Sequence, residues 1–320
     1  MKTIWLVIPC YNEEEIISKT AECTKKLMYS LISAEKISKA SRILFVNDGS
    51  KDRTYEIIQN LCKEDKIFAC VNLSRNRGHQ NALLAGLMTA KNYADAVISM
   101  DADLQDDINV IKDFIDKFEE GYDVVYGVRC DRTTDTFFKK FTAESFYKFM
   151  KLMGVDVVYN HADYRLMSKR ALDGLSEFDE VNTFLRGIVP LIGYKSTTVS
   201  YARKKREAGK TKYSLRKMIS FAMEGITSFS VRPIKLALAL GVISFLVSIG
   251  MLIYCIYEHS IGNTVSGWAS LGVSIWAIGG LQMLMLGIVG EYVGKIYLET
   301  KHRPKYIIES VTLTEEVDDE

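Results

Sequence analysis

The first 130 residues alternate between short apolar runs and longer segments whose apolar side chains recur at helical spacing. The apolar runs have the length of strands and cover residues 3–9, 41–48, 67–73, 95–101 and 122–129. The helical segments between them cover residues 12–32, 52–64, 78–93 and 108–121. This order predicts an α/β domain with a mostly parallel, Rossmann-like sheet and helices on both faces. In such a sheet, ligands bind beyond the carboxyl ends of the strands.

The carboxy-terminal third has a different pattern, with two long runs that contain no charged residue, Leu236–Tyr257 and Ser260–Gly290. Because a helix needs about 20 apolar residues to cross a bilayer, each run predicts one transmembrane helix, the second over Trp268–Gly290. The alternative is a pair of buried core helices. Lys and Arg flank the two runs on their outer sides, whereas residues 258–267 between them contain neither. The positive-inside rule then predicts cytoplasmic termini and an external loop.

Composition and charge narrow the class of protein further. Lys and Arg number 41 and Asp and Glu 40, so the net charge of +1 gives no indication of nucleic-acid binding. The six cysteines are irregularly spaced and include no C-x-x-C pair, which favours free thiols in a reducing compartment. The amino end, "MKTIWLVIPCYNEE", has too short an apolar run for a signal peptide. The terminal "EEVDDE" predicts a solvated acidic tail.

An acidic cluster follows the fourth predicted strand in the stretch "DAVISMDADLQDD". Asp101, Asp103 and Gln105 alternate at a spacing of two, so in an extended segment their side chains point to the same side. Carboxylate and amide oxygens suit Mg²⁺ or Mn²⁺, which also keep contact with substrate phosphates. The alternative is a solvated acidic turn. Polar residues at the ends of the neighbouring predicted strands favour the metal site.

Several motifs occur together and in order: "VIPCYNEE", "FVNDGSKDRT", "LSRNRGHQNALLAGL", "MDADLQDD", "YGVR", "ADYRLMS" and "AGKTKYSLRKM". On these motifs the sequence resembles the family 2 inverting glycosyltransferases of the GT-A fold. Within that family it is most similar to the polyprenyl-phosphate glycosyltransferases, the group of bactoprenol glucosyltransferase and dolichol-phosphate mannose synthase. The resemblance covers nearly the whole chain. It implies a metal-dependent transfer of a sugar from a nucleotide donor, and its relatives suggest a homotetramer.

The resemblance also assigns roles to matching positions on the donor side. It implies that Pro9, Tyr11, Glu13 and Asp48 border the nucleotide base. It places Asp101 near the ribose and diphosphate as well as on the metal, with Asp103 and Gln105 as further ligands. Asp163 faces the acceptor side of the sugar, where it would orient the sugar or act as a base. Asn47 departs from the family pattern, because an aspartate is common at that position. The predicted catalytic residues are Asp101, Asp103 and Asp163.

Cations at the same predicted edge indicate where the acceptor phosphate binds. Arg129 ends a strand there, and Lys139, Lys140 and Thr142 begin the next helix, a favourable place for a phosphate. In the resembled family this region receives the lipid phosphate, while the alternative is an ordinary basic helix face. Arg206 could bind the acceptor phosphate, the donor diphosphate or anionic headgroups. His79 and His161 have no metal-ligand partner at helical spacing, so both are interpreted as polar or packing residues.

The resulting prediction is an enzyme in four parts. They are a cytoplasmic GT-A catalytic domain over 1–211, juxtamembrane amphipathic helices over 212–232, a two-helix transmembrane region over 233–297 and a cytoplasmic acidic tail over 298–320.

The predicted reaction transfers a sugar, from UDP-glucose or UDP-N-acetylglucosamine, to undecaprenyl phosphate at the cytoplasmic face of the bacterial plasma membrane. A GDP-mannose-dependent mannose synthase is the alternative substrate choice. A processive polysaccharide synthase is disfavoured because the chain has neither a QxxRW motif nor more than two long apolar runs. The alternative from another class is a non-catalytic membrane scaffold that retains a sugar-nucleotide-binding domain.

Overall fold

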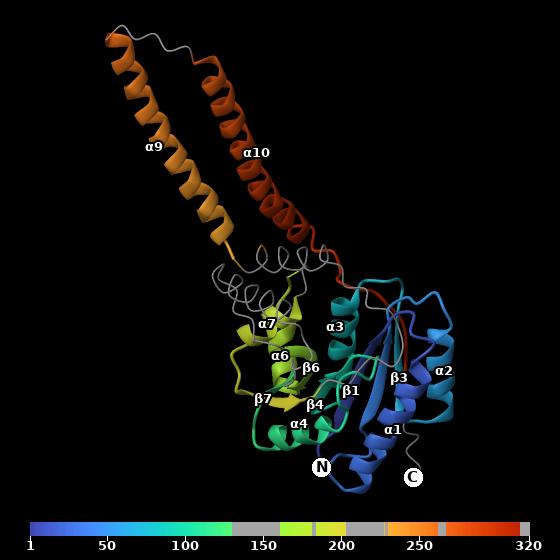
Figure 1. Ribbon diagram of the computed structural model, residues 1–320. Helices are drawn as coiled ribbons and strands as arrows, with labels where there is room; N and C mark the ends of the chain where they lie inside the picture. The colour runs from blue at the N-terminus through green and yellow to red at the C-terminus, as the bar shows by residue number, and fades with distance from the viewer. Residues whose placement is uncertain (130–160, 181–183, 203–226, 228–229, 262–266, 314–320) are drawn as a thin grey trace. The chain divides into compact units, whose positions relative to one another are not determined.

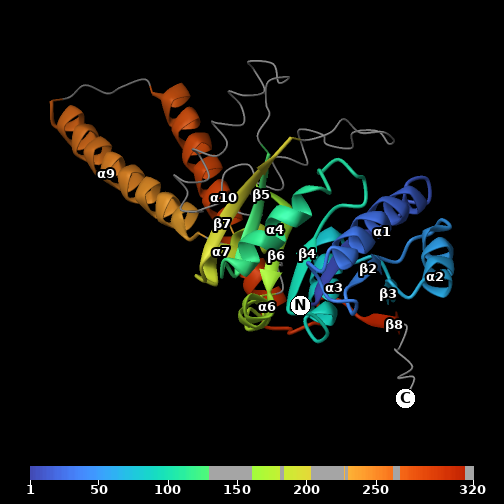
Figure 2. The same ribbon diagram turned by 90° about the horizontal axis from the view of Figure 1, so that it is seen from below.

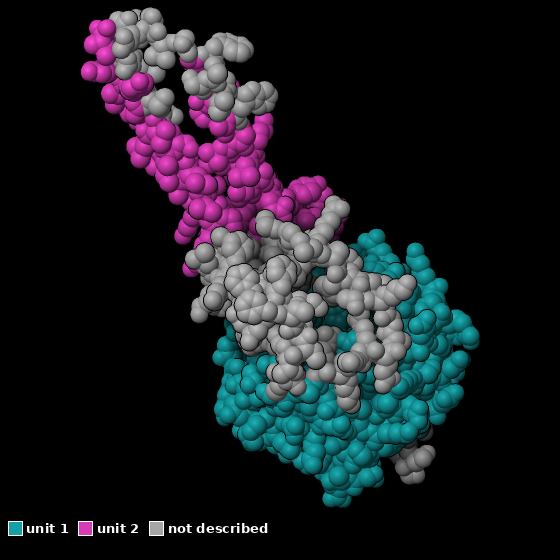
Figure 3. Space-filling model, viewed as in Figure 1, with its two compact units in different colours: residues 1–147, 157–213, 304–320 teal, residues 148–156, 214–303 magenta. Residues whose placement is uncertain are grey.

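The computed structural model describes residues 1–129, 161–180, 184–202, 227, 230–261 and 267–313. The chain forms two compact units, coloured separately in Figure 3. The first combines residues 1–147, 157–213 and 304–320, and the second combines residues 148–156 and 214–303. Predictions for residues 130–160 and 203–226, which include most of the juxtamembrane helices, fall outside the described residues.

The first unit is built on an eight-stranded sheet (Figure 1). Its strands lie in the order β7-β5-β6-β4-β1-β2-β3-β8. Their bounds are β1 Ile4–Cys10, β2 Arg42–Asn47, β3 Phe68–Leu73, β4 Ala96–Ser99, β5 Val124–Arg129, β6 His161–Ser168, β7 Ser196–Tyr201 and β8 Ile308–Thr312. The central strands β3, β2, β1 and β4 are mutually parallel. These are four of the five strands that the hydrophobic pattern predicts, and the parallel arrangement is confirmed for them.

Helices cover both faces of this sheet, as predicted (Figure 2). In the first unit they are α1 Ile17–Ser33, α2 Thr54–Glu64, α3 His79–Ala90, α4 Val110–Glu119, α6 Lys169–Ser176 and α7 Leu185–Leu191. Alternate side chains of β1, beginning with Ile4, join the core formed with α1, α2 and α4. On the opposite face α3 packs very close to β1 and β2. A Cβ atom on Gly86 would lie 2.5 Å from Val7 and 2.6 Å from Val46, so only glycine fits there.

The remaining strands make the sheet mixed rather than wholly parallel. β6 is antiparallel to both β4 and β5, between which it lies. β5 therefore runs in the same direction as β4, and β7 is parallel to β5. As a result, the amino end of β6 meets the carboxyl ends of β1, β2, β3, β4, β5 and β7 at one edge. We call this edge of the sheet the carboxyl edge.

The last strand comes from the far end of the chain. β8 pairs antiparallel with β3 and completes the sheet on that side. The sequence analysis assigned residues 298–320 to an acidic tail and missed this strand, as it missed β6, β7, α6 and α7. Residues 314–320, which contain the "EEVDDE" run, are not among the described residues.

The second unit contains two long helices, α9 Arg232–Ser260 and α10 Trp268–Glu299. Among the residues that the structure describes, one stretch is long and apolar enough to cross a membrane, Ala277–Glu299, with a mean hydropathy of 1.3 and none of its 18-residue window buried. One candidate span is therefore found where the sequence predicts two. The second transmembrane helix stays a prediction.

Candidate active site

Two turns at the carboxyl edge are joined by hydrogen bonds between their backbones and side chains. The turn after β1 donates the Asn12 N–H to Ser50 Oγ at 3.1 Å and the Glu13 N–H to Thr54 Oγ1 at 2.8 Å. In return, the N–H of Lys51 donates to Asn12 Oδ1 at 2.8 Å. These reciprocal bonds fix both turns before any ligand binds. Pro9 is the buried next-to-last residue of β1, and the Tyr11 residue just after the strand, 41% exposed, is accessible for contact with a planar ring.

Asp48 links the turn after β2 to the loop that precedes α3. Its side chain is 2% exposed, and it accepts the N–H of Arg77 at 2.6 Å and the N–H of Gly78 at 2.9 Å. Burial raises the pKa of this carboxyl, although the two N–H donors act in the opposite direction. Gly49 has φ +63°, and a Cβ there would lie 2.6 Å from the Asn76 nitrogen. Asp48 therefore holds two loops together, whereas the sequence analysis expected it to border the base.

The acidic segment after β4 does not have the geometry that its spacing suggested. β4 ends at Ser99, and Leu104 has φ +52°, so residues 101–105 form a turn and not an extended strand end. The expectation of an extended segment, in which alternation would make Asp101, Asp103 and Gln105 point to one side, is therefore wrong. Gln105 is only 5% exposed, while the Asp101 side chain is 36% exposed.

The acidic turn is anchored from two other elements. Thr20 of α1 donates its hydroxyl to the Ala102 carbonyl at 2.6 Å, and Tyr164 of β6 donates to the Asp107 carbonyl at 3.0 Å. Within the turn, Asp103 Oδ1 accepts the N–H of Gln105 at 3.2 Å. A turn held in this way presents Asp101 and Asp103 from a fixed backbone.

The electrostatics of this turn suit a divalent cation. Partial burial raises the pKa of Asp101, and the carboxylates of Asp163, Asp106 and Asp103 raise it further, while His79 lowers it. A bound cation would relieve this repulsion. Among the described residues, no three His, Cys, Asp or Glu side chains form a metal cage. At phosphate-transfer sites, one or two carboxylates together with substrate phosphates typically hold Mg²⁺ or Mn²⁺, and the charge and chemistry of Asp101 and Asp103 are compatible with such a site.

Asp163 lies at the start of β6, surrounded by donors. It is 5% exposed, and Arg186 of α7 binds it through both oxygens, at 3.2 and 3.0 Å. Arg165 donates to Oδ1 at 2.6 Å, and Gln80 donates to Oδ2 at 3.1 Å. Burial alone would raise the pKa of Asp163, but the two guanidinium groups lower it well below its usual range. A carboxylate so firmly paired is a poor proton acceptor, so the geometry favours an orienting role over a basic one.

The sequence analysis undervalued His79, which it interpreted as a polar or packing residue. His79 Nε2 lies 3.6 Å from Asp101 Oδ1 and 3.8 Å from Asp163 Oδ2, with its side chain 44% exposed. It begins α3 next to Gln80, whose Nε2 donates to Asp163 Oδ2, so the start of this helix approaches Asp163 with two polar side chains. The sequence did indicate that His79 lies near the site, because the motif "GHQNA" follows a strand whose carboxyl end lies at the same edge. His161 begins β6.

Arg129 ends β5 at the carboxyl edge, as predicted. Its Nη2 lies 3.3 Å from Asp106 Oδ1, and its Nε donates to the Tyr201 hydroxyl at 3.3 Å. The Tyr201 hydroxyl in turn donates to Asp106 at 2.6 Å. Burial would lower the pKa of Arg129, but Asp106 and Tyr201 outweigh it and raise the pKa, so the guanidinium stays charged. The side chain keeps 25% of its surface exposed beside the acidic turn.

Four of the predicted site residues are not among the described residues. They are Lys139, Lys140, Thr142 and Arg206. Conversely, the structure adds Arg186, which approaches Asp163 from another element. Arg165 stands two residues after Asp163 on the same strand, so strand alternation could have paired them. No local pattern points to Arg186, because 23 residues separate it from Asp163.

A mixed α/β sheet with an acidic turn after its fourth strand is the arrangement expected of a glycosyltransferase of the GT-A fold. The chain belongs to glycosyl transferase family 2, whose family model matches residues 5–175.

Three curated relatives match nearly the full chain. An uncharacterized glycosyltransferase, YkoT, of Bacillus subtilis (strain 168) is 53% identical over 304 residues, which are 95% of this chain and 90% of that protein. A prophage bactoprenol glucosyl transferase homolog of Escherichia coli (strain K12) is 41% identical and covers 96% of this chain and 99% of its own. The bactoprenol glucosyl transferase of Shigella phage SfV is 40% identical, with coverages of 96% and 98%.

Proposed function

We propose that this enzyme transfers one sugar from a nucleotide sugar to a polyprenyl phosphate at a membrane surface, by a single displacement that inverts the anomeric carbon. The observation that carries the proposal is the meeting of the acidic turn, Asp101 to Asp107, with the cation Arg129 at the carboxyl edge. A donor diphosphate and an acceptor phosphate are both anions, so a site that joins them needs both a cation-binding turn and a fixed positive charge. The relatives described as bactoprenol glucosyl transferases support the choice of acceptor.

The donor would bind over the joined turns that follow β1 and β2. Tyr11 supplies an exposed ring for the base, and Pro9 and Glu13 flank it. Asp48 contributes by holding the loop before α3 in place. We infer a UDP-sugar, glucose or N-acetylglucosamine, as the donor, with GDP-mannose as the alternative.

Asp101 and Asp103 would hold Mg²⁺ or Mn²⁺ in this scheme, and Gln105 would support the turn from its buried position. When bound, the ion stabilises the charge of the departing nucleotide diphosphate. Asp163, held by Arg186 and Arg165, would orient the sugar. These side chains supply fixed charges at the reaction centre, which need no rearrangement as the bond breaks.

The acceptor phosphate would bind Arg129 together with Lys139, Lys140 and the hydroxyl of Thr142 in the segment after β5, and Arg206 in the segment after β7. A phosphate monoester has a second pKa of about 6, so at neutral pH it is already a nucleophile. The reaction therefore does not require a strong base. This agrees with the full pairing of Asp163, whose depressed pKa makes it unsuitable for accepting a proton.

The structure gives one candidate membrane span, and the proposal adds a second. We infer that α9 and α10 both cross the plasma membrane, with the catalytic unit and both termini in the cytoplasm, and that the enzyme forms a homo-oligomer, a tetramer by resemblance. A cysteine introduced at Asn263, after removal of the native cysteines, should react with a membrane-impermeant thiol reagent in intact cells. Labelling that requires cell lysis would contradict this topology.

The decisive experiment uses the full chain purified in detergent with Mg²⁺ or Mn²⁺. UDP-glucose, UDP-N-acetylglucosamine and GDP-mannose, each radiolabelled in the sugar, are offered with undecaprenyl phosphate or with undecaprenol. We expect labelled lipid and released nucleoside diphosphate with one donor, and only with the phosphorylated lipid. Equal release without lipid would contradict the acceptor assignment. Binding of a donor with no transfer to the lipid would support the non-catalytic scaffold.

A further inference from the structure

A continuous series of side-chain hydrogen bonds joins the carboxy-terminal strand β8 to the turns of the proposed donor site. Asn72 at the end of β3 donates from Nδ2 to Glu309 Oε2 of β8 at 2.8 Å. Asn47 at the end of β2 donates from Nδ2 to Asn72 Oδ1 at 2.7 Å. Asn47 Oδ1 then accepts the N–H of Ser50 at 3.2 Å, and Ser50 Oγ accepts the N–H of Asn12 at 3.1 Å.

Every bond in this series points the same way, from the turns toward Glu309. A carboxylate only accepts hydrogen bonds, so it forces Asn72 to present its NH₂ group to β8 and its carbonyl oxygen to Asn47. Asn47 must then present its own NH₂ group to Asn72, which leaves its carbonyl oxygen for the Ser50 N–H. Both asparagines are buried, with 3% of Asn47 and 8% of Asn72 exposed, so solvent does not substitute for a reversed amide.

We propose that Glu309 is a positioning residue for donor binding, because it sets the direction of this hydrogen-bonded series and thereby the conformation of the two turns. The effect reaches Asn12, which has φ +53° and follows the exposed Tyr11 directly. Glu309 lies 237 residues after Asn72 in the sequence, so a distant segment supports the turns of the proposed donor site. The inference rests on the proposed function, since it names the donor as the ligand of these turns.

Other features of β8 do not reach the donor turns and supply the controls. Thr312 accepts a hydrogen bond from Gln59 of α2 at 3.2 Å, and Ser310 lies 3.3 Å from the Tyr55 hydroxyl of the same helix.

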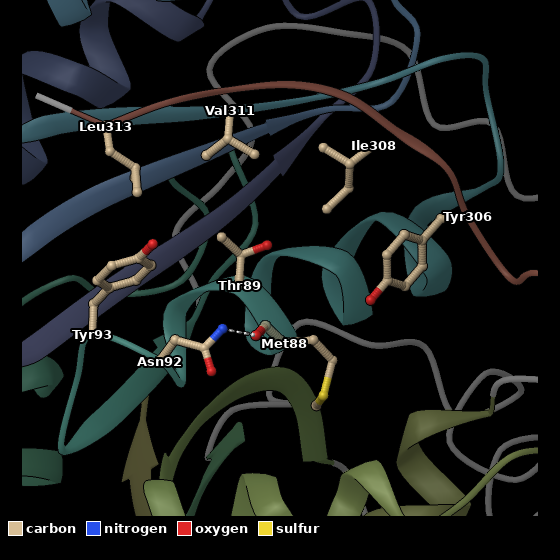
Figure 4. A pocket seen from close by; sticks show the side chains of 8 residues that line it. All are labelled: Met88, Thr89, Asn92, Tyr93, Tyr306, Ile308, Val311 and Leu313. Carbon is tan, nitrogen blue, oxygen red and sulfur yellow. Dashed lines mark hydrogen bonds between the residues drawn. The ribbon is translucent and has the colours of Figure 1, made fainter.

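A pocket of about 480 Å³ lies between β8 and the end of α3 and is shown in Figure 4. It is lined by Met88, Thr89, Asn92, Tyr93, Tyr306, Ile308, Val311 and Leu313. Since α3 begins at the carboxyl edge and ends near this pocket, the pocket lies away from the acidic turn.

The first test compares Glu309→Ala with Thr312→Val in the full-length protein, with UDP-glucose, UDP-N-acetylglucosamine and GDP-mannose as the binding probes. We expect Glu309→Ala to raise the Kd of whichever donor the wild type binds by about five- to tenfold, the effect of one or two lost hydrogen bonds. The KM for undecaprenyl phosphate should stay unchanged. Thr312→Val removes a β8 contact of similar kind and should leave both constants unchanged. Equal effects of the two variants on donor Kd would overturn the proposal, because they would show a general role of β8.

The second test reverses the direction of the series. In Asn47→Asp the new carboxylate cannot donate to Asn72, and Asn72 cannot turn around without directing its oxygen at Glu309. Donor affinity should fall by about tenfold. Adding Glu309→Gln supplies an amide that can donate to the reversed Asn72, so N47D/E309Q should recover most of the lost affinity, whereas N47D/T312V should not. If E309Q leaves the N47D defect intact, the proposal is wrong.

These outcomes are distinguishable from a failure of the proposed function. If the wild-type enzyme bound none of the three donors, the function itself would be contradicted before any variant was compared. If the wild type binds a donor and the paired variants show no rescue, the function stands and the role of Glu309 falls. Thermal unfolding of each variant, measured in the same detergent, shows whether a change in Kd reflects loss of the fold.

Discussion

The two halves of the carboxyl edge are held together by different kinds of interaction. In the donor half, formed by β1, β2 and β3, polar side chains such as Asp48 and Asn47 bind backbone N–H groups of neighbouring turns. In the other half, formed by β4, β6, β5 and β7, charged side chains bind one another. Asp163 pairs there with Arg165 and Arg186, and Asp106 with Arg129.

This difference shows how each half can meet its own ligand. Hydrogen bonds to backbone groups fix the shape of the loops, which suits recognition of a base by its shape. Ion pairs in a partly buried site hold charged groups at fixed positions, which suits stabilisation of the charge that develops during a reaction. Removing one member of a buried ion pair leaves an uncompensated charge, whereas removing a side chain that accepts from backbone N–H groups leaves only unsatisfied neutral donors. The two halves should therefore fail differently when they are mutated.

The largest effect is expected at the acidic turn. Asp103→Ala should abolish turnover, because the remaining Asp101 would hold the proposed cation alone, while the thermal unfolding temperature should change little since Asp103 is only partly buried. Turnover measured with a titration of Mg²⁺ and Mn²⁺ checks this. Full wild-type activity in excess chelator would refute the metal requirement.

The next effect concerns stability in the charged half. Asp163→Ala leaves Arg165, 1% exposed, without its carboxylate, and should lower the free energy of unfolding by about 3–5 kcal/mol. Asp48→Ala in the donor half leaves two backbone N–H groups unsatisfied and should lower it by about 2 kcal/mol. Urea unfolding of both variants provides the measurement. The contrast between the halves would be lost if Asp48→Ala proved the more damaging change.

A smaller effect is expected on acceptor use. Arg129→Ala should lower kcat/KM for the lipid phosphate about ten- to a hundredfold, since a charge-assisted hydrogen bond contributes roughly 1.5–3 kcal/mol. Donor binding measured without lipid should stay unchanged. Arg170→Ala, which removes an exposed arginine on α6 with 66% of its side chain accessible, is the matched control. Weakened donor binding with an unchanged lipid KM would place Arg129 in the diphosphate site instead.

The smallest effect is a difference in pH dependence between the halves. The pKa of Asp163 is lowered by folding, so its contribution to stability is complete above the ordinary carboxyl value of about 3.9 and is lost as the pH falls below it. The pKa of Asp48 is raised by folding, so its contribution is greatest at low pH and is lost as the pH rises through the raised value.

The measurement is urea unfolding of wild type, Asp163→Asn and Asp48→Asn between about pH 7 and pH 3.5. The stability advantage of wild type over Asp163→Asn should shrink as the pH falls. The difference between wild type and Asp48→Asn should move in the opposite direction. Parallel changes in the two differences would show that the pKa values of these buried carboxyls are not shifted in opposite senses.

The sequence by itself determined the central part of the fold and predicted the edge of the sheet at which the candidate site lies. Period-two and helical periodicity are local, so they predicted the strands and helices up to Arg129 and the parallel order of the central strands. The polar ends of those strands predicted one functional edge, and the motifs predicted the glycosyltransferase family that residues 5–175 match. These conclusions need no knowledge of which distant residues meet.

Only the tertiary structure decided how the edge is completed. The direction of β6 is absent from its hydrophobic pattern, yet its antiparallel insertion brings Asp163 to the edge, where Arg186 reaches it from α7. The spacing of Asp101, Asp103 and Gln105 misled because Leu104 adopts a left-handed conformation and turns the chain. Glu309 meets Asn72 across 237 residues. Contacts of this kind depend on packing between distant segments, and local periodicity carries no information about such packing.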